Sequence, residues 1–320
     1  MKTLILLSIS LFVACLFSSC GSVVSHAPVV KKPYEDFQSE QKSFVSEEGT
    51  IRYIDKGPRD GEPILLLHGV PTSGWLYRHM IDDLVKRGYR VIAPDMLGFG
   101  SSDSPKGYEI YSEKHHAKRI VAMMNSLGLK SWNHVCHDAG GLWTQALALH
   151  SPESIKSLTL LNCVLLDEGF DPPVRMNKGP GAKLVMYGYR NKLTNRILIK
   201  ALFKHGMEDW EKLSISDKEG YRRPLMEGKT KGIYYFFTKT CNYLPDYRDG
   251  LNNLAKRNCP VQVIWGTNDE ILHWEPQAND VSELLEIDSS DIHLLDANHF
   301  LQEEEPEQLS KFIDEFVGSR

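Results

Sequence analysis

Residues 136–141 read Cys-His-Asp-Ala-Gly-Gly and lie between an apolar run at 132–135 and a second apolar segment at 142–149. The first run predicts a buried strand, the small residues predict a sharp turn, and the second segment predicts a helix. In such a turn the central side chain, here Asp138, stands above the end of the sheet close to backbone N–H groups. A carboxylate attacks an acyl carbon poorly but attacks a saturated carbon with a leaving group well. The motif alone also fits an ordinary polar loop, so its meaning depends on partners elsewhere in the chain.

Short apolar runs alternate with amphipathic stretches over much of the chain. Seven runs are predicted to be strands of a buried sheet: residues 51–55, 63–67, 89–93, 132–136, 157–161, 261–265 and 292–295. Helices are expected at residues 76–87 and 112–127, and a final helix is expected to begin near Pro306. This alternation predicts an α/β fold with helices on both faces of a mostly parallel sheet.

The alternation stops between residues 166 and 258, a stretch that contains many aromatic and basic residues. We expect this stretch to be a helical cap inserted into one α/β core, which comprises residues 43–165 and 259–320. An insertion at the carboxyl edge of a parallel sheet lies over the crevice where such sheets bind ligands. The cap is therefore expected to shape the substrate pocket.

Two further polar side chains follow predicted strands at the same edge as Asp138. Asp269 comes after the run at 261–265, and His299 comes after the run at 292–295. The chain order of nucleophile, acid and histidine is the order of the α/β-hydrolase plan. Taken singly, Asp269 fits a turn aspartate and His299 fits a solvated histidine, but their joint placement favours a catalytic triad. His115 and His116 are expected to be solvated, and His137 is expected to be a structural neighbour of the nucleophile.

The sequence His68-Gly69-Val70-Pro71 directly follows the predicted strand at 63–67. In the same plan this loop donates one backbone N–H to an oxyanion hole, and the residue after the nucleophile donates the other. The amides of Val70 and Ala139 are therefore the predicted oxyanion-hole donors.

The chain resembles the aspartate-nucleophile branch of the α/β-hydrolases, which comprises haloalkane dehalogenases and epoxide hydrolases, over residues 45–318. The stretches most similar to haloalkane dehalogenases are HGVPTSGWLYR at 68–78, APDMLGFGSSD at 93–103, CHDAGG at 136–141, WGTND at 265–269 and NHFLQEEEP at 298–306. The resemblance implies an α/β-hydrolase fold in which Asp138 forms an ester with a carbon of the substrate. It also implies that His299, oriented by Asp269, activates the water that hydrolyses this ester.

The sequence departs from haloalkane dehalogenases at the two residues that hold the departing halide. Those enzymes place a tryptophan directly after the nucleophile and a polar residue after His-Gly, whereas this chain has Ala139 and Val70. Each hydrogen bond to a charged group contributes about 1.5–3 kcal/mol, so the loss of two is serious. Epoxide hydrolases instead use paired cap tyrosines, for which Tyr187 with Tyr234 or Tyr235 are the candidates, although aromatic residues at helical spacing also fit a cap core.

The missing halide donors favour epoxide opening by a small margin. Haloalkane hydrolysis is the first alternative, because the flanking motifs match that family. A non-catalytic binder of small molecules on the same fold is the second alternative. The expected ligand in each case is a small hydrophobic organic compound, and neither a cofactor nor a metal is implied because no phosphate-binding loop or ligand cluster occurs.

The composition and the ends of the chain add further expectations. The 320 residues carry a formal net charge of −5, which argues against a nucleic-acid partner. Residues 1–20 resemble a bacterial lipoprotein signal peptide, with Cys20 as the predicted site of lipidation, and residues 21–42 are expected to be a tether. The protein is thus expected to be exported to the periplasm or cell surface, with membrane contact only through this anchor. Cleavage of the signal peptide without lipidation is the alternative. The sequence leaves its oligomeric state open.

Four cysteines follow the predicted signal peptide. Cys136 and Cys163 lie in apolar runs and are predicted to be buried small hydrophobes. Cys241 and Cys259 are candidates for a disulfide, although the cysteine spacing indicates neither a disulfide framework nor a zinc site.

Overall fold

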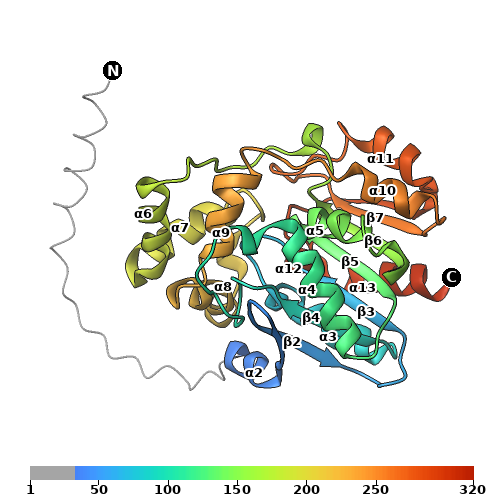
Figure 1. Cartoon of the computed structure of the whole chain (residues 1–320), viewed down its shortest axis with the longest axis horizontal. Coiled ribbons are helices and arrows are strands. Elements are labelled where there is room, and N and C mark those ends of the chain that lie inside the picture. Colours follow the sequence, from blue (N-terminus) through green and yellow to red (C-terminus); the bar gives the residue numbers. More distant parts are fainter. Residues whose placement is uncertain (1–32) are drawn as a thin grey trace. The chain divides into compact units, whose positions relative to one another are not determined.

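The central feature of the computed structural model, which describes residues 33–320, is an eight-stranded sheet (Figure 1). The strands are β1 (Lys42–Ser46), β2 (Gly49–Lys56), β3 (Pro63–Leu67), β4 (Arg90–Asp95), β5 (Trp132–Asp138), β6 (Ile155–Cys163), β7 (Val261–Gly266) and β8 (Ile292–Leu295). Their order across the sheet is β1-β2-β4-β3-β5-β6-β7-β8. The pairs β1–β2 and β2–β4 are antiparallel and the other pairs are parallel. Strands β3, β4, β5 and β7 are buried along their whole length, as expected for strands covered on both faces.

Helices cover both faces of this sheet. They include α3 (Arg78–Lys86), α4 (Glu113–Ser126), α5 (Ala139–Ala148), α10 (Arg248–Ala255), α11 (Ala278–Leu285), α12 (Leu301–Glu304) and α13 (Pro306–Gly318). Helix α3 packs with α12 and α13, whereas α5 packs with α4 and α10, and α10 packs with α11. The connections β3–α3–β4 and β4–α4–β5 run in opposite directions across the sheet, so right-handed crossovers place α3 and α4 on opposite faces.

The reversal of direction occurs between the neighbouring strands β3 and β5. In open α/β sheets, ligands bind outside the carboxyl ends of the strands at such a switch point. The loop after β3 contains Val70, and β5 ends at Asp138. The topology therefore brings two of the predicted site residues to the same crevice.

The insertion between β6 and β7 is helical. It contains α6 (Pro180–Arg190), α7 (Lys192–Phe203), α8 (Ile215–Met226), α9 (Lys231–Tyr235) and a π-helical turn η6 (Phe236–Thr240). Short 3-10 turns occur in the described chain at η1 (Gly74–Tyr77), η2 (Glu109–Tyr111), η3 (Pro152–Ser154), η4 (Asp167–Gly169), η5 (Trp210–Lys212) and η7 (Ser289–Asp291). Helix α6 contacts α7, α8 and α9, so these four helices form the cap. Helix α10, which the sequence placed in the cap, differs: a Cβ on Gly250 would lie 2.1 Å from the carbonyl oxygen of Gln145, so α10 packs closely on α5 of the core.

The seven strands predicted from the sequence are confirmed, each within two residues of its observed ends. The helix expected at 76–87 begins as η1 and continues as α3, the helix expected at 112–127 is α4, and the last helix begins at Pro306. The predicted signal peptide and Cys20 lie outside the described residues. Within residues 33–320, no helix has both the length and the apolar character needed to span a bilayer.

The expectation of a tether as far as residue 42 is wrong for residues 33–42. Residues Pro33–Glu40 form helix α2, and β1 begins at Lys42. Tyr34 and Phe37 are buried and meet the Trp75 ring edge-on, with ring centroids 5.2 and 5.3 Å away. Two aromatic residues separated by three positions give α2 an apolar face, so this segment is part of the folded core.

This packing predicts that Phe37→Ala destabilises the protein by about 3 kcal/mol, because a buried aromatic side chain is replaced by a cavity. Urea unfolding, monitored by circular dichroism, measures the change in the free energy of unfolding. Ser39→Ala, at an exposed position of the same helix, is the matched control and is expected to be nearly neutral. Equal stabilities of the two variants would mean that α2 behaves as a tether.

Candidate active site

Asp138 lies at the junction of β5 and α5 in a backbone conformation that side chains rarely adopt, with φ of 52° and ψ of −127°. The turn closes tightly because its next residues are small. A Cβ on Gly140 would lie 2.9 Å from the carbonyl oxygen of His68, and a Cβ on Gly141 would lie 2.6 Å from Cβ of Cys163. Larger residues would force α5 away from the sheet. The strained turn and its two glycines thus hold the Asp138 carboxylate at the crevice.

The loop after β3 binds one oxygen of this carboxylate. The backbone N–H of Val70 donates a hydrogen bond of 2.6 Å to Oδ1 of Asp138. A Cβ on Gly69 would lie only 2.2 Å from the same oxygen, so only glycine permits this approach. His68 fixes the loop, because its Nδ1 lies 2.6 Å from the carbonyl oxygen of Gly69 and its Nε2 accepts from the Met96 N–H at 2.9 Å.

The second oxygen of Asp138 faces a histidine that is oriented by another carboxylate. Nε2 of His299 lies 3.8 Å from Oδ2 of Asp138, and its Nδ1 lies 2.8 Å from Oδ2 of Asp269. Oδ1 of Asp269 accepts from the backbone N–H groups of Ile271 and Leu272 at 2.8 and 3.0 Å. The structure therefore brings Asp138, Asp269 and His299 together in the order expected from the sequence.

Burial and charge set the protonation of this trio. Burial opposes ionisation of Asp269, but His299 and hydrogen bonds from Asn162 and Ile271 outweigh it, so the pKa of Asp269 is lowered. Burial also opposes a charged His299, yet the Asp269 carboxylate outweighs this effect and raises the pKa of His299 above 6.5. Burial raises the pKa of Asp138 above 3.8, although His299 and the N–H groups of Ala139 and Val70 oppose this rise. Asp269 is thus well suited to stabilise a protonated His299.

The cavity in front of Asp138 is narrow and mostly apolar. Its volume is about 30 Å³, close to the space that one water molecule needs. Apart from Asp138 and His299, its lining side chains are hydrocarbon: Val70, Pro71, Phe170, Pro172, Pro173, Leu202, Phe236, Phe237, Ile271 and Phe300. Among the described residues that line it, none carries a hydroxyl or an indole N–H. Charge that develops here depends on the backbone amides and on His299.

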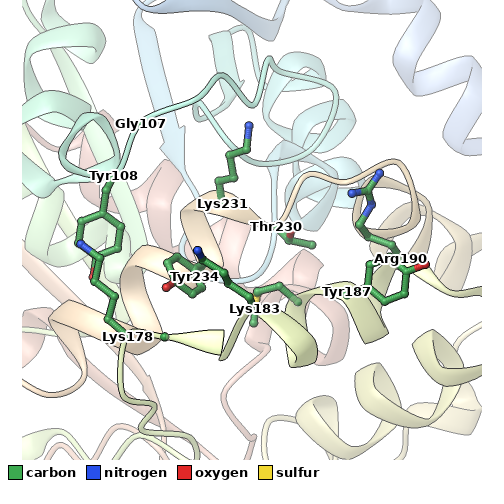
Figure 2. Close-up of a pocket in the computed structure, with 11 residues that line it drawn as sticks. Gly107, Tyr108, Lys178, Lys183, Tyr187, Arg190, Thr230, Lys231 and Tyr234 are labelled. Atoms are coloured by element: carbon green, nitrogen blue, oxygen red, sulfur yellow. The ribbon is translucent and has the colours of Figure 1, made fainter. Parts of the chain in front are cut away.

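The three tyrosines expected at this cavity lie elsewhere, which corrects the sequence interpretation. Tyr187 and Tyr234 line a separate cavity formed by α6 and α9 (Figure 2). Tyr235 is buried and packs against Leu97 and Tyr111. The physical reason is that α9 gives way to the π-helical turn η6, so that Phe236 and Phe237 face Asp138 instead.

The other histidines and the cysteines fit the expectations only in part. His116 is buried against Trp143, with ring centroids 4.4 Å apart, so the expectation that it is solvated is wrong. His137 is a structural neighbour, since its Nε2 donates to the carbonyl oxygen of His299 at 2.8 Å. Cys136 and Cys163 are buried as predicted, with sulfur atoms 3.5 Å apart. Cys241 and Cys259 are both free, so the candidate disulfide is not formed.

Sequence reasoning missed Asn162, which supports the acid from the end of β6. Its Nδ2 donates to Oδ2 of Asp269 at 2.6 Å, and its Oδ1 accepts from the Gly266 N–H at 2.8 Å. Asn162 has a φ of 38°, a conformation that asparagine tolerates better than most residues. A single amide inside the apolar run of β6 is the signal that identifies it. The phenylalanines of the cavity give no such signal, because they look like ordinary core residues.

The pairing of His299 with Asp269 predicts a lower pKa of His299 in the Asp269→Asn variant. Burial without a carboxylate partner lowers the pKa of His68 to about 4 and that of His134 to about 3. Removing the charge of Asp269 takes away the largest effect that raises the pKa of the buried His299, so this pKa is expected to fall, although Asp138 at 3.8 Å still raises it. Nuclear magnetic resonance titration of the imidazole signals measures both values, with His299→Gln used to assign the signal.

Asn268→Ala is the matched control, because this side chain bonds the neighbouring Asp296 instead of the histidine. It is expected to leave the titration of His299 in place. A pKa of His299 that is the same in Asp269→Asn as in the unaltered protein would contradict the electrostatic role given to Asp269.

Comparison with known proteins places this geometry in a family. Residues 62–306 match the alpha/beta hydrolase fold family. A haloalkane dehalogenase of Psychrobacter cryohalolentis is 28% identical over 83% of this chain and 87% of its own length. A second haloalkane dehalogenase, from Mycolicibacterium paratuberculosis, is 28% identical over 82% of this chain and 86% of its own length. The crystal structure of an epoxide hydrolase from Vigna radiata superimposes with a TM-score of 0.69 at 23% identity, over 88% of this chain and 98% of that one. The chain is a hydrolase and belongs to the alpha/beta hydrolase fold family.

Proposed function

We propose that this hydrolase acts through an ester formed between Asp138 and a saturated carbon of a small apolar substrate. The observation that carries the proposal is the different environment of the two carboxylate oxygens. Oδ1 accepts a hydrogen bond from Val70, whereas Oδ2 faces Nε2 of His299. One oxygen is thus held by the backbone, while the other is left for attack on carbon.

In the first step, Oδ2 of Asp138 attacks the carbon and the bond to the leaving group breaks with its electron pair. The apolar walls contributed by Phe170, Phe236 and Phe237 exclude bulk water and leave the carboxylate poorly solvated, which strengthens it as a nucleophile. Because the product of this step is an ester, the negative charge of Asp138 is transferred to the leaving group.

In the second step, His299 removes a proton from water, and the water oxygen attacks Cγ of Asp138. The charge that develops then resides on Oδ1, which already lies against the Val70 amide. A well-placed donor at this position typically lowers the barrier of such a step by about 3 kcal/mol. Asp269 stabilises the imidazolium, which returns its proton as the alcohol leaves. The bond between Cγ and Oδ2 then breaks, so Oδ2 leaves as the oxygen of the alcohol and the water oxygen remains on the carboxylate of Asp138.

For the leaving group, we favour the oxygen of an epoxide. The epoxide oxygen stays bonded to the product and takes a proton from the imidazolium of His299, whose pKa is raised, before neutral His299 acts as the base of the second step. A free halide ion instead needs donors that the side chains of Val70 and Ala139 lack. The cap tyrosines no longer support this choice, since they lie away from Asp138. Haloalkane hydrolysis is the second candidate, because two curated relatives that match most of the chain are named haloalkane dehalogenases.

The ester predicts that His299→Ala stalls after the first step. Mass spectrometry of this variant, after incubation with a panel of small epoxides and haloalkanes, is expected to show a covalent adduct on the peptide that contains Asp138. The unaltered enzyme is expected to release a diol from epoxides or halide from haloalkanes. Turnover in ¹⁸O-labelled water is expected to place the label on the carboxylate of Asp138.

Two variants are the controls. His150→Ala, at an exposed position, is expected to turn over normally, and Asp138→Asn is expected to form no adduct. Turnover by the unaltered enzyme without label on Asp138 would refute the ester. Release of halide alone would replace the epoxide assignment with the dehalogenase one.

We also propose that the protein is exported and carries a lipid on Cys20. The support is the sequence of residues 1–20, with a lysine at position 2, an apolar stretch and small residues before the cysteine. Cys20→Ser is expected to move the protein from the membrane fraction to the soluble fraction of cells, measured by immunoblotting. Cys15→Ser is the matched control, and unchanged partitioning of Cys20→Ser would refute lipidation.

A further inference from the structure

A second cavity, between the cap and the Tyr108 loop, is distinct from the one at Asp138. It has a volume of about 510 Å³, within the usual range for small-molecule sites. Figure 2 shows Lys178 against the Tyr108 ring at one end, Tyr187 and Arg190 at the other, and Tyr234 between them. Neither Asp138 nor His299 lines it, so its ligand need not be the substrate.

The cavity has a marked excess of positive charge. Lys178, Lys183, Arg190 and Lys231 line it, and none of its lining residues is acidic. In the part of the chain that the structure describes, none of these four cations lies within ion-pair distance of a carboxylate. Two other cap lysines, by contrast, are paired: Lys200 with Glu211, and Lys212 with Glu208.

The cations also act on one another. The Lys231 ammonium donates to the carbonyl oxygen of Ser104, a neutral acceptor, at 2.5 Å. Burial, together with repulsion from Lys106, Lys229 and Arg190, lowers the pKa of Lys231. Cations crowded without counter-charges attract anions strongly.

The remaining walls are aromatic and apolar. The Lys178 ammonium lies 3.4 Å from the centroid of the Tyr108 ring, and Tyr234 meets that ring at a centroid distance of 5.9 Å. Met186 adds an apolar surface, and Tyr187 is 65% exposed although it is a large aromatic residue. These side chains offer a stacking surface next to the cations.

We propose that this cavity binds an organic anion, with a phosphate, sulfate or carboxylate group on the lysines and Arg190 and an apolar body against the tyrosine rings. Charge-assisted hydrogen bonds from several cations provide affinity for the head group, and the rings select for an apolar body. This inference is independent of the ester chemistry at Asp138.

Such an anion has two possible sources, a dissolved metabolite or the head group of an anionic lipid. Three large apolar side chains on α6 and α7, Leu184, Leu193 and Ile197, are at least 70% exposed. Exposed apolar side chains beside basic residues are typical of surfaces that insert into anionic membranes. The test therefore includes a membrane arm.

The first arm uses isothermal titration calorimetry with hexyl phosphate, and with hexanol as its uncharged analogue. Hexyl phosphate is expected to bind, and hexanol is expected to bind at least about tenfold more weakly because it lacks the charge-assisted hydrogen bonds. The variant Lys183→Gln/Arg190→Gln is expected to lose about tenfold or more in affinity for hexyl phosphate. Both side chains are exposed, so the fold is expected to be retained, which circular dichroism checks.

The matched control is Lys200→Gln/Lys212→Gln. It also removes two positive charges from the cap, but at positions that do not line the cavity. It is expected to bind hexyl phosphate as the unaltered protein does. Equal binding of hexanol and hexyl phosphate, or equal losses in the two double variants, would overturn the proposal, because either result would show that the cavity does not recognise the anion.

The second arm measures co-sedimentation with phosphatidylcholine vesicles, with and without phosphatidylglycerol. Binding that requires phosphatidylglycerol and is lost in both Lys183→Gln/Arg190→Gln and Leu193→Ser/Ile197→Ser supports the cavity as a lipid head-group site. Binding of hexyl phosphate without any preference for anionic vesicles supports a dissolved anion instead. A lipid anchor at Cys20 would increase binding to both kinds of vesicle. The difference in binding between the two kinds therefore reports on the cap.

Discussion

The approach of the β3 loop to the Asp138 carboxylate is the contact on which the active site depends. It exists because β3 and β5 are neighbours at the switch point of the sheet and because Gly69 has no side chain. The 2.6 Å bond from Val70 then provides a hydrogen-bond donor for a buried carboxylate oxygen. The strained backbone of Asp138 is maintained by the rigid sheet beneath it, in which Cys136 and Cys163 pack side by side. The packing of the core thus holds the backbone of Asp138 in an unfavourable conformation.

The sequence predicts that Asp138, Asp269 and His299 lie close together because strand ends in a parallel sheet meet at one edge. Asp138, Asp269 and His299 each follow an apolar run, and the order of these runs in the chain determines their neighbours once the crossovers are right-handed. Glycines at 69, 140 and 141 mark places where backbones approach closely, which is a local property of the residue type. These features depend on short segments and on simple topology, so they can be read without knowing the rest of the fold.

The sequence predicts the side-chain positions of the cap less well, because packing between helices determines them. Tyr187 and Tyr234 both line the larger cavity, the first exposed and the second half-buried, whereas Tyr235, next to Tyr234 in the sequence, is buried. The π-helical turn that follows α9 rotates the next residues, so that Phe236 and Phe237 face Asp138. Helix α2 was missed for a related reason: its two aromatic residues have meaning only once Trp75 is known to lie beneath them. Sequence periodicity identifies an apolar face, but not its partner.

The segment from Lys231 to Phe237 separates the two cavities described above. Lys231 and Tyr234 line the larger one, while Phe236 and Phe237 line the smaller one at Asp138. Protein interiors are close-packed, so a rigid partition cannot yield on one side without moving on the other. With only about 30 Å³ free before the carboxylate, a small rotation of this partition changes the available space by a large fraction. One helical turn is thus the common wall of the two cavities, and a displacement of that turn alters the space on both sides of it.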